Sequence, residues 1–465
     1  MTLQRLPAGA VYALAALGLL LAAVAGAAHA GSDGPADAFQ GAAAGMAGLV
    51  IVVAAVLVRP AWPLSLGVAL AAFSGHWDEM NIPVPLDRVL ILSGIGSALV
   101  RKWQEGRGLR TRPIDWLLII VGGYAICSAV VAGTIDESSP RFNLLDRFSL
   151  VAFVAFYVAP FAFRELRDRQ ILLGTFVALG GYLGLTALIE TTGPRGILLP
   201  RYIDDPLVGT HFDRARGPFA EAAANGMILY ACAIAGVIAA LTWRDRRLRG
   251  IAIAVAALCM LGTLLTVTRA IWIGTIAGTI VALLAARETR RFIPTVAVGG
   301  AVVVLAAFAT IPGLQAQAEQ RSENDRPVWA RQNSNAAALR MLDEKPTFGF
   351  GWGTYRTESP NFYRQADDYP LVFIRDVHNV YLGNAVELGL VGAGLWLFAL
   401  LWAIGGAVTM RGPPDLRAWK IGLLGMTCMY LVVGSTTPLS FTMPTLLLWT
   451  WAGICWVERP ARQHS

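Results

Sequence analysis

The residues whose types and spacing best suit chemistry are His378 and Asn379, directly before a long apolar segment. Nine residues separate Asn379 from Gly389, and Gly392 follows after two more. A neutral imidazole at the mouth of a membrane helix can take up a proton near neutral pH, which makes His378 a candidate general base. An interfacial histidine that caps a helix, followed by glycines that allow close helix packing, explains the same residues. The residues alone favour neither interpretation.

Arginines form a second group of candidates. Four of them, on a segment expected to lie outside the cytoplasm, are Arg195, Arg201, Arg214 and Arg216. Short loops on that side normally avoid Lys and Arg, and guanidinium groups near the lipid headgroups would suit a phosphate ligand. The alternative is ordinary composition, because only three of the 38 basic residues are lysines and nearby aspartates could pair with the arginines.

Arg269 interrupts an apolar sequence at the turn between two expected spans. A charge at membrane depth is costly and usually functional, so we expect Arg269 to face an anion. The alternative is a turn residue whose charged end reaches the membrane surface, with Trp272 as an interfacial anchor.

The elements that must position these residues are membrane helices. The chain has 465 residues, of which 55% are hydrophobic and 15% charged, and its long apolar runs exclude a soluble domain. Each span must satisfy its own backbone hydrogen bonds in hydrocarbon, so the fold class is all-α. The apolar stretches predict a polytopic transmembrane helical bundle of about 12–14 spans with a partly helical outer loop domain.

Basic clusters predict the orientation of this bundle. They lie at residues 101–112, 164–169, 244–249, 287–291 and 411–420. Lys and Arg concentrate in cytoplasmic loops, so these loops and both termini should be cytoplasmic. Residues 12–28 are then interpreted as an uncleaved first span rather than a signal peptide. The net charge of +7 indicates contact with anionic lipid and does not imply nucleic-acid binding.

The chain is expected to form one membrane domain, residues 1–465. Its segments are a first outer loop at residues 192–220, a large outer loop at 313–378 and C-terminal spans at 379–457. Residues 331–344 suit a helix, and Gly349, Gly351 and Gly353 indicate a tight binding loop after it. The five cysteines lie inside apolar stretches, so the sequence indicates neither a disulfide in the outer loops nor a metal site.

Taken together, four motifs resemble the O-antigen ligase and polymerase superfamily of bacterial envelope glycosyltransferases, and its O-antigen ligases in particular. His378-Asn379 with Gly389 and Gly392 is similar to the family's His-Asn-x9-Gly-x-x-Gly motif. The other matches are Arg216-Gly-Pro-Phe with Asn225, Thr268-Arg269-Ala-Ile-Trp, and the segment from Arg331 to Gly351. The resemblance spans residues 214–394. Its departures, which bear on the acceptor subtype more than on the family, are Ala224, Asn335, Thr347-Phe348 and Ala393.

This resemblance implies the transfer of a preassembled O-antigen polysaccharide from undecaprenyl pyrophosphate to lipid A-core. It places the reaction on the periplasmic face of the bacterial cell inner membrane, so residues 192–220 become the first periplasmic active-site loop and 313–378 the large periplasmic loop. It implies no metal and no other cofactor. The implied partners are the lipid-linked glycan donor, the lipid A-core acceptor and membrane lipid, without nucleic acid.

The resemblance also assigns roles to residues. His378 is expected to act as the base that takes the acceptor proton in an inverting displacement. Binding of the pyrophosphate, without a metal, is expected from Arg216, Arg269 and Arg214. The expected supporting residues are Asn379, Asp376, Arg331 and Asn225, with Asp376 either orienting the imidazole or pairing with Arg375.

Two other functions stay open. An O-antigen polymerase would use the same donor with a second lipid-linked glycan as acceptor, although the His-Asn form favours the ligase. A lipid-linked glycan transporter would explain the many spans and the arginines without catalysis. Transporters more often show repeat halves with a site near the membrane midplane, and the sequence indicates neither.

Overall fold

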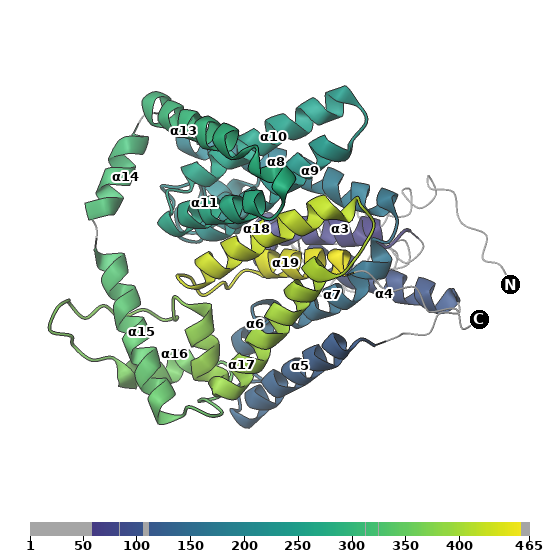
Figure 1. Cartoon of the computed structure of the whole chain (residues 1–465). Helices are drawn as coiled ribbons and strands as arrows, with labels where there is room; N and C mark the ends of the chain where they lie inside the picture. Colours follow the sequence, from purple (N-terminus) through teal and green to yellow (C-terminus); the bar gives the residue numbers. More distant parts are fainter. Residues whose placement is uncertain (1–57, 83, 106–110, 312, 324, 457–465) are drawn as a thin grey trace, which may run out of the picture.

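The computed structural model describes residues 58–82, 84–105, 111–311, 313–323 and 325–456 (Figure 1). The expected first span at residues 12–28 lies outside these ranges. Within them every regular element is helical and no strand is present. The α-helices are α3 (Ala61–Leu70), α4 (Leu86–Gln104), α5 (Pro113–Val131), α6 (Ser138–Asp146), α7 (Leu150–Ala162), α8 (Leu166–Thr192), α9 (Ala222–Thr242), α10 (Arg246–Leu265), α11 (Arg269–Leu284), α12 (Arg287–Arg290), α13 (Ile293–Thr310), α14 (Leu314–Glu323), α15 (Arg326–Glu344), α16 (Tyr355–Glu358), α17 (Val380–Thr409), α18 (Leu416–Gly434) and α19 (Thr442–Cys455).

Short 3-10 helices occupy the connections between these elements. They are η1 (Ala71–Phe73), η2 (Asp78–Met80), η3 (Arg195–Ile197), η4 (Arg201–Asp204), η5 (Gly217–Phe219) and η6 (Ser359–Phe362). Three of them, η3 to η5, fall in the segment 192–220. Between the end of α8 and the beginning of α9, this segment contains only these short helices. The predicted helix at residues 331–344 is confirmed as the greater part of α15.

The all-α polytopic bundle predicted from the sequence is confirmed. Among the described residues, eight helical segments are long and apolar enough to cross a membrane, and two shorter apolar ones, Ala61–Phe73 and Arg269–Leu284, accompany them. Helix α6 and helix α7 form one of these segments, Ser138–Ala162, interrupted at Ser149, where the backbone turns with a φ of 90°.

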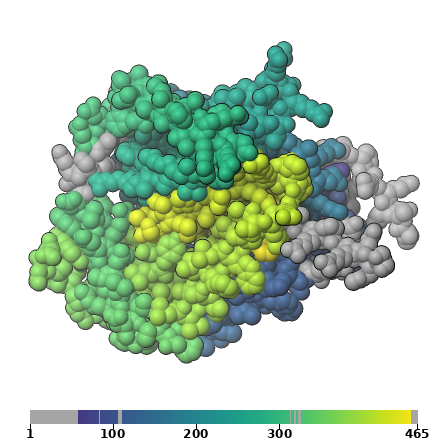
Figure 2. Space-filling model, viewed as in Figure 1, coloured from purple at the N-terminus to yellow at the C-terminus, as the bar shows by residue number. Residues whose placement is uncertain are grey.

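The core lies around α9 and α19. Every residue of α19 from Met443 to Cys455 is buried. Helix α9 packs against α8 and α10, α19 against α7, α18 against α11, and α17 against α5. Small residues allow these approaches: a Cβ on Gly180 would lie 2.8 Å from the Cys232 Cβ. In the space-filling view, α17 to α19 lie between the teal helices and the blue α5 (Figure 2).

Helix α13 differs from the others because only Ala307 is buried among its residues. Its other side chains, which are largely apolar, face outward. In a membrane such a surface meets lipid tails, so it needs no protein partner.

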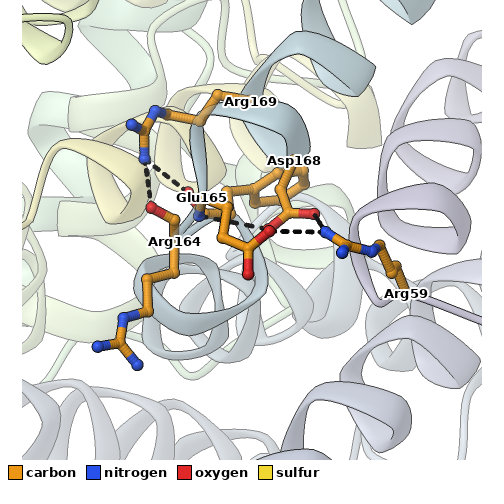
Figure 3. A network of polar contacts seen from close by, with 6 residues as sticks. Arg59, Arg164, Glu165, Asp168 and Arg169 are labelled. Atoms are coloured by element: carbon orange, nitrogen blue, oxygen red, sulfur yellow. Dashed lines mark hydrogen bonds and ion pairs between the residues drawn. The ribbon is translucent and has the colours of Figure 1, made fainter.

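One end of the bundle is held by ion pairs between helix ends (Figure 3). Arg59 donates to Glu165 at 2.8 Å and to Asp168 at 3.3 Å. Arg169, on the same first turn of α8, pairs with Asp415. These contacts bring the beginning of α3, the turn between α7 and α8, and the beginning of α18 to one place.

Three predicted cytoplasmic clusters meet there. The Arg169–Asp415 pair joins cluster 164–169 to cluster 411–420, and Arg417 pairs with Glu288 of cluster 287–291 at 2.7 Å. Helix connectivity places the segments 192–220 and 313–378 at the other end. In Figure 1, α14, α15 and α16 stand together at the left edge, beyond that end.

The glycine-rich loop after α15 docks onto a kink in α17. Gly389 interrupts α17 with a φ of 68° and a ψ of 176°. The helix hydrogen bonds lost at the kink are replaced by the loop backbone: Phe350 N donates to Val386 O and Leu390 N donates to Pro346 O, at 2.9 and 2.8 Å. Gly349 also has a positive φ, 73°, and lies against the Gly389 amide. The glycines predicted to form a binding loop thus hold two segments of backbone in contact.

We expect Gly389→Ala to destabilise the protein. The positive φ alone costs on the order of 1–3 kcal/mol for a residue with a side chain, and the new Cβ would lie 2.1 Å from Thr347 O. Gly394→Ala is the matched control, because this glycine lies on the same helix and a Cβ there meets nothing within 4 Å. The midpoint of thermal unfolding in detergent should fall for Gly389→Ala and stay unchanged for Gly394→Ala. Equal midpoints would contradict this role of the kink.

The two ends of the bundle should face opposite compartments. Gln365, in the segment 313–378, and Arg411, in a basic cluster, are both exposed. In a variant whose five native cysteines are replaced, a membrane-impermeant maleimide added to intact spheroplasts should label Gln365→Cys. Arg411→Cys should react only after the membrane is opened. The reverse pattern would refute the predicted orientation.

Candidate active site

His378, the last residue of the segment 313–378, lies two residues before α17 and is half-buried. Its Nδ1 is 3.1 Å from the backbone oxygen of Asp376. When Nδ1 carries the proton and donates to this carbonyl, Nε2 keeps its lone pair and can accept a proton. The backbone therefore orients the imidazole for the role of a base.

Burial lowers the pKa of His378, because the charged imidazolium loses solvation. The positive charge of Arg331 lowers it further, while the carbonyl of Asp376 acts in the opposite direction. The ring is therefore neutral at neutral pH, which is the form that a general base requires.

The neighbours of His378 differ in part from the sequence interpretation. Asp376 directs its carboxylate to Arg356, whose Nε and Nη2 donate at 2.9 Å each. Only its backbone carbonyl reaches the imidazole, so the expectation that its side chain orients His378 or pairs with Arg375 is corrected. Asn379 is the N-cap of α17, because its Oδ1 accepts from Tyr381 N at 3.0 Å and from Leu382 N at 3.1 Å.

Arg331, on α15, lies near His378 and also near Arg269, the first residue of α11. Burial lowers the pKa of Arg331, and the nearby positive charge of Arg269 lowers it further. The Nε of Arg331 is buried and makes no hydrogen bond within the described part of the chain. Two guanidinium groups so close repel each other, and an anion between them would remove that cost.

Arg214 approaches the same turn from the segment 192–220. Its Nη1 donates to the Thr268 hydroxyl at 3.1 Å, directly before Arg269. Ala215 N donates to Leu265 O at 3.2 Å, which holds the loop against the end of α10. Arg214 is buried, and its Nε finds no acceptor among the described residues. These contacts link Arg214, Arg269 and Arg331 to one another and, through Arg331, to His378.

Arg216 occupies a different environment from Arg214. Its side chain is fully buried, and its guanidinium donates to the backbone carbonyls of Ile203, Val208 and Asp205. These hydrogen bonds hold Arg216, directly before η5, against residues 203–208 at and after the end of η4. In this conformation both Nη groups donate to the chain, whereas the buried Nε finds no acceptor among the described residues, so the geometry favours a positioning role for Arg216.

Two buried residues support this loop. Asn225 Nδ2 donates to Ala215 O at 3.0 Å, which ties α9 to the loop. Glu190, at the end of α8, accepts from Arg216 N at 3.3 Å and Gly217 N at 3.0 Å. Sequence reasoning missed Glu190. The sequence feature that could have identified Glu190 is a lone carboxylate near the end of an otherwise apolar span. A charge at that position is costly unless it forms hydrogen bonds or an ion pair.

The grouped residues can hold an anion beside a base. No cluster of three or more His, Cys, Asp or Glu side chains that could hold a metal occurs in the described residues. The guanidinium groups are the cations that the site itself offers to a phosphate, with planar donors suited to its oxygens.

Comparison with protein families places these residues in a known context. The family model described as O-antigen ligase matches residues 254–397, whereas no curated protein matches the chain. The matched segment contains Arg269, Arg331, His378 and the kink at Gly389. Over this segment, the chain is similar to the O-antigen ligase family.

Proposed function

We propose that this protein is an O-antigen ligase. The family implies a function of the O-antigen ligase or polymerase type, exercised by a glycosyltransferase-like enzyme in a multi-pass membrane protein. The observation that carries the proposal is the contact of His378 Nδ1 with the Asp376 carbonyl, with Arg331 nearby and Arg269 near Arg331. The donor would be a preassembled O-antigen polysaccharide on undecaprenyl pyrophosphate, and the acceptor lipid A-core, at the periplasmic face of the inner membrane.

The proposed reaction is a single displacement. A hydroxyl oxygen of the acceptor attacks the anomeric carbon of the donor sugar from the face opposite the pyrophosphate. A new glycosidic bond forms as the bond from that carbon to the pyrophosphate oxygen breaks, which inverts the anomeric centre. His378 Nε2 takes the hydroxyl proton, and undecaprenyl pyrophosphate leaves with the bonding electron pair.

The arginines stabilise the leaving group in this scheme. Charge increases on the pyrophosphate as the sugar leaves, so cations already in place lower the barrier most. Arg269, Arg331 and Arg214 fit this role because they approach one turn from three segments. Arg216 would act indirectly, by holding the loop that carries Arg214.

The first test is transfer in vitro from the lipid-linked donor to lipid A-core by purified protein. General bases typically contribute 10²–10⁴-fold, so His378→Ala should lower transfer by at least about 10²-fold. The matched control is His211→Asn, a histidine substitution in segment 192–220 that tolerates the φ of 55° there and should retain activity. A chelator should leave native activity unchanged.

Each outcome of this assay separates the candidates. Undiminished transfer by His378→Ala, with unfolding midpoints equal to native, would remove the base from the mechanism. Product that forms only with a second lipid-linked glycan as acceptor would indicate an O-antigen polymerase. Donor movement across vesicles without any glycosidic bond formed would indicate a transporter.

The pH dependence tests the proximity of Arg331 and His378. Activity should fall at acid pH as His378 becomes protonated, with an apparent pKa below the usual 6.5. Arg331→Gln removes a charge that disfavours the imidazolium, so this acid limb should move to higher pH. Arg331→Lys keeps the charge and should leave the limb in place. The measurement is kcat/KM against pH, and an unmoved limb in Arg331→Gln would contradict the proposed coupling.

A further inference from the structure

The carbonyl that orients His378 belongs to a stretch of chain without regular structure. Between the end of η6 at Phe362 and the beginning of α17 at Val380, residues 363–379 form neither helix nor strand. The hydrogen bonds of a regular element therefore do not hold this backbone, and its position depends on side-chain contacts. The Asp376 carbonyl lies 3.1 Å from His378 Nδ1. The orientation of the imidazole depends on what holds that carbonyl in place.

This carbonyl is part of the planar peptide unit that joins Asp376 to Val377, and a different side chain holds each end of the unit. At one end, Val377 is buried in an apolar cluster with Ala338 and Met341 of α15. At the other end, the Asp376 carboxylate accepts from Arg356 Nε and Nη2 at 2.9 Å each. Two parallel bonds from a planar guanidinium fix the direction of a carboxylate as well as its distance. With both ends held, the carbonyl keeps one direction.

Arg356 is itself tied to the helix that follows His378. It lies on the short helix α16, directly after Tyr355, whose backbone N donates to Glu387 Oε1 at 3.4 Å. Glu387 is buried on α17, nine residues after His378. A closed ring of contacts therefore runs from His378 along α17 to Glu387, then through α16 and Asp376 back to the imidazole.

The pair of Arg356 and Asp376 suits orientation better than stability. The Arg356 side chain is 52% exposed and the Asp376 side chain 26% exposed, and exposed ion pairs contribute little to the stability of a fold. The carboxylate also balances the charge of Arg356, whereas the Nε of Arg331 makes no hydrogen bond within the described part of the chain. We therefore expect loss of the pair to release one carbonyl and to leave both the fold and the binding of the donor intact.

We propose that Arg356 is a positioning residue for His378. Its paired hydrogen bonds to Asp376 direct the backbone carbonyl that keeps the imidazole proton on Nδ1, which leaves Nε2 free to accept a proton. The hydrogen bond made by one ring nitrogen decides which nitrogen carries the proton. The inference rests on the proposed function only for its effect on transfer, because the tautomer of His378 is measurable without any transfer.

The first test is the tautomer of His378, measured by solid-state NMR of the imidazole nitrogens. The full-length protein carries isotope-labelled histidine and is placed in lipid bilayers at weakly alkaline pH, where the ring is neutral. The chain has five histidines, so the signal is identified by its absence from His378→Ala. The native protein should carry the proton on Nδ1. In Arg356→Gln and in Asp376→Ala, which both keep the backbone carbonyl of residue 376, part of the signal should move to the Nε2–H tautomer.

Arg417→Gln is the matched control for these variants. Arg417 also forms an exposed ion pair, with Glu288, and this pair lies at the other end of the bundle. The same substitution there should leave the tautomer of His378 as in the native protein.

The second test is transfer from the lipid-linked donor to lipid A-core, with kcat and KM measured separately. Arg356→Gln should lower kcat about threefold to tenfold, the equivalent of one hydrogen bond, and leave the KM for the donor unchanged. The double variant Arg356→Gln/Asp376→Ala should be no slower than the slower single variant, because both substitutions remove the same contact.

The inference is overturned if the native protein carries the proton on Nε2, if Arg356→Gln and Asp376→Ala both keep the native tautomer, or if Arg417→Gln changes it equally. A raised KM with unchanged kcat in Arg356→Gln would also overturn it, since Arg356 would then bind substrate. Native protein without transfer activity, but with the expected change of tautomer in the variants, would contradict the proposed function alone. Equal unfolding midpoints show that the changes do not reflect lost folding.

Discussion

The candidate active site depends on a backbone contact, the docking of the glycine-rich loop into the kink of α17. A helix interrupted at Gly389 leaves amide and carbonyl groups without their usual partners, and in a membrane protein such groups must find others. The loop supplies them through Phe350 and Leu390. Since the loop follows α15 and the kink follows His378, this contact fixes the helix that carries Arg331 relative to the histidine.

Electrostatics then divides the outer end of the bundle into two regions. Near His378, burial and the positive charge of Arg269 lower the pKa of Arg331, and the charge of Arg331 in turn helps to lower the pKa of His378. In the cavity between η1, η2, the beginning of α4 and the end of α6, Arg88 pairs with Asp146.

Much of this architecture was predictable from the sequence, for identifiable reasons. Long apolar runs permit only helices in hydrocarbon, and the alternation of basic clusters assigned the segments 192–220 and 313–378 to one end. His378 and Arg269 were found because a charged or ionisable residue at a span boundary is unusual, whereas Arg331 was found through the resemblance of its segment to a family motif. Partners brought together by tertiary packing could not be read this way: the carboxylate of Asp376 turns to Arg356, and Arg216 is enclosed by carbonyls of its own loop. Glu190 and the cavity beside α6 likewise depend on residues far apart in the sequence.

The length of α17 bears on the position of His378 relative to the bilayer. Thirty residues of helix extend about 45 Å, whereas the hydrocarbon core of a bilayer is about 30 Å thick. Residues 390–409, after the kink, already match that thickness. With residues 390–409 across the hydrocarbon, the turns before Gly389 and His378 itself would lie at the level of the lipid headgroups. The kink thus sets the height of the candidate base above the hydrocarbon.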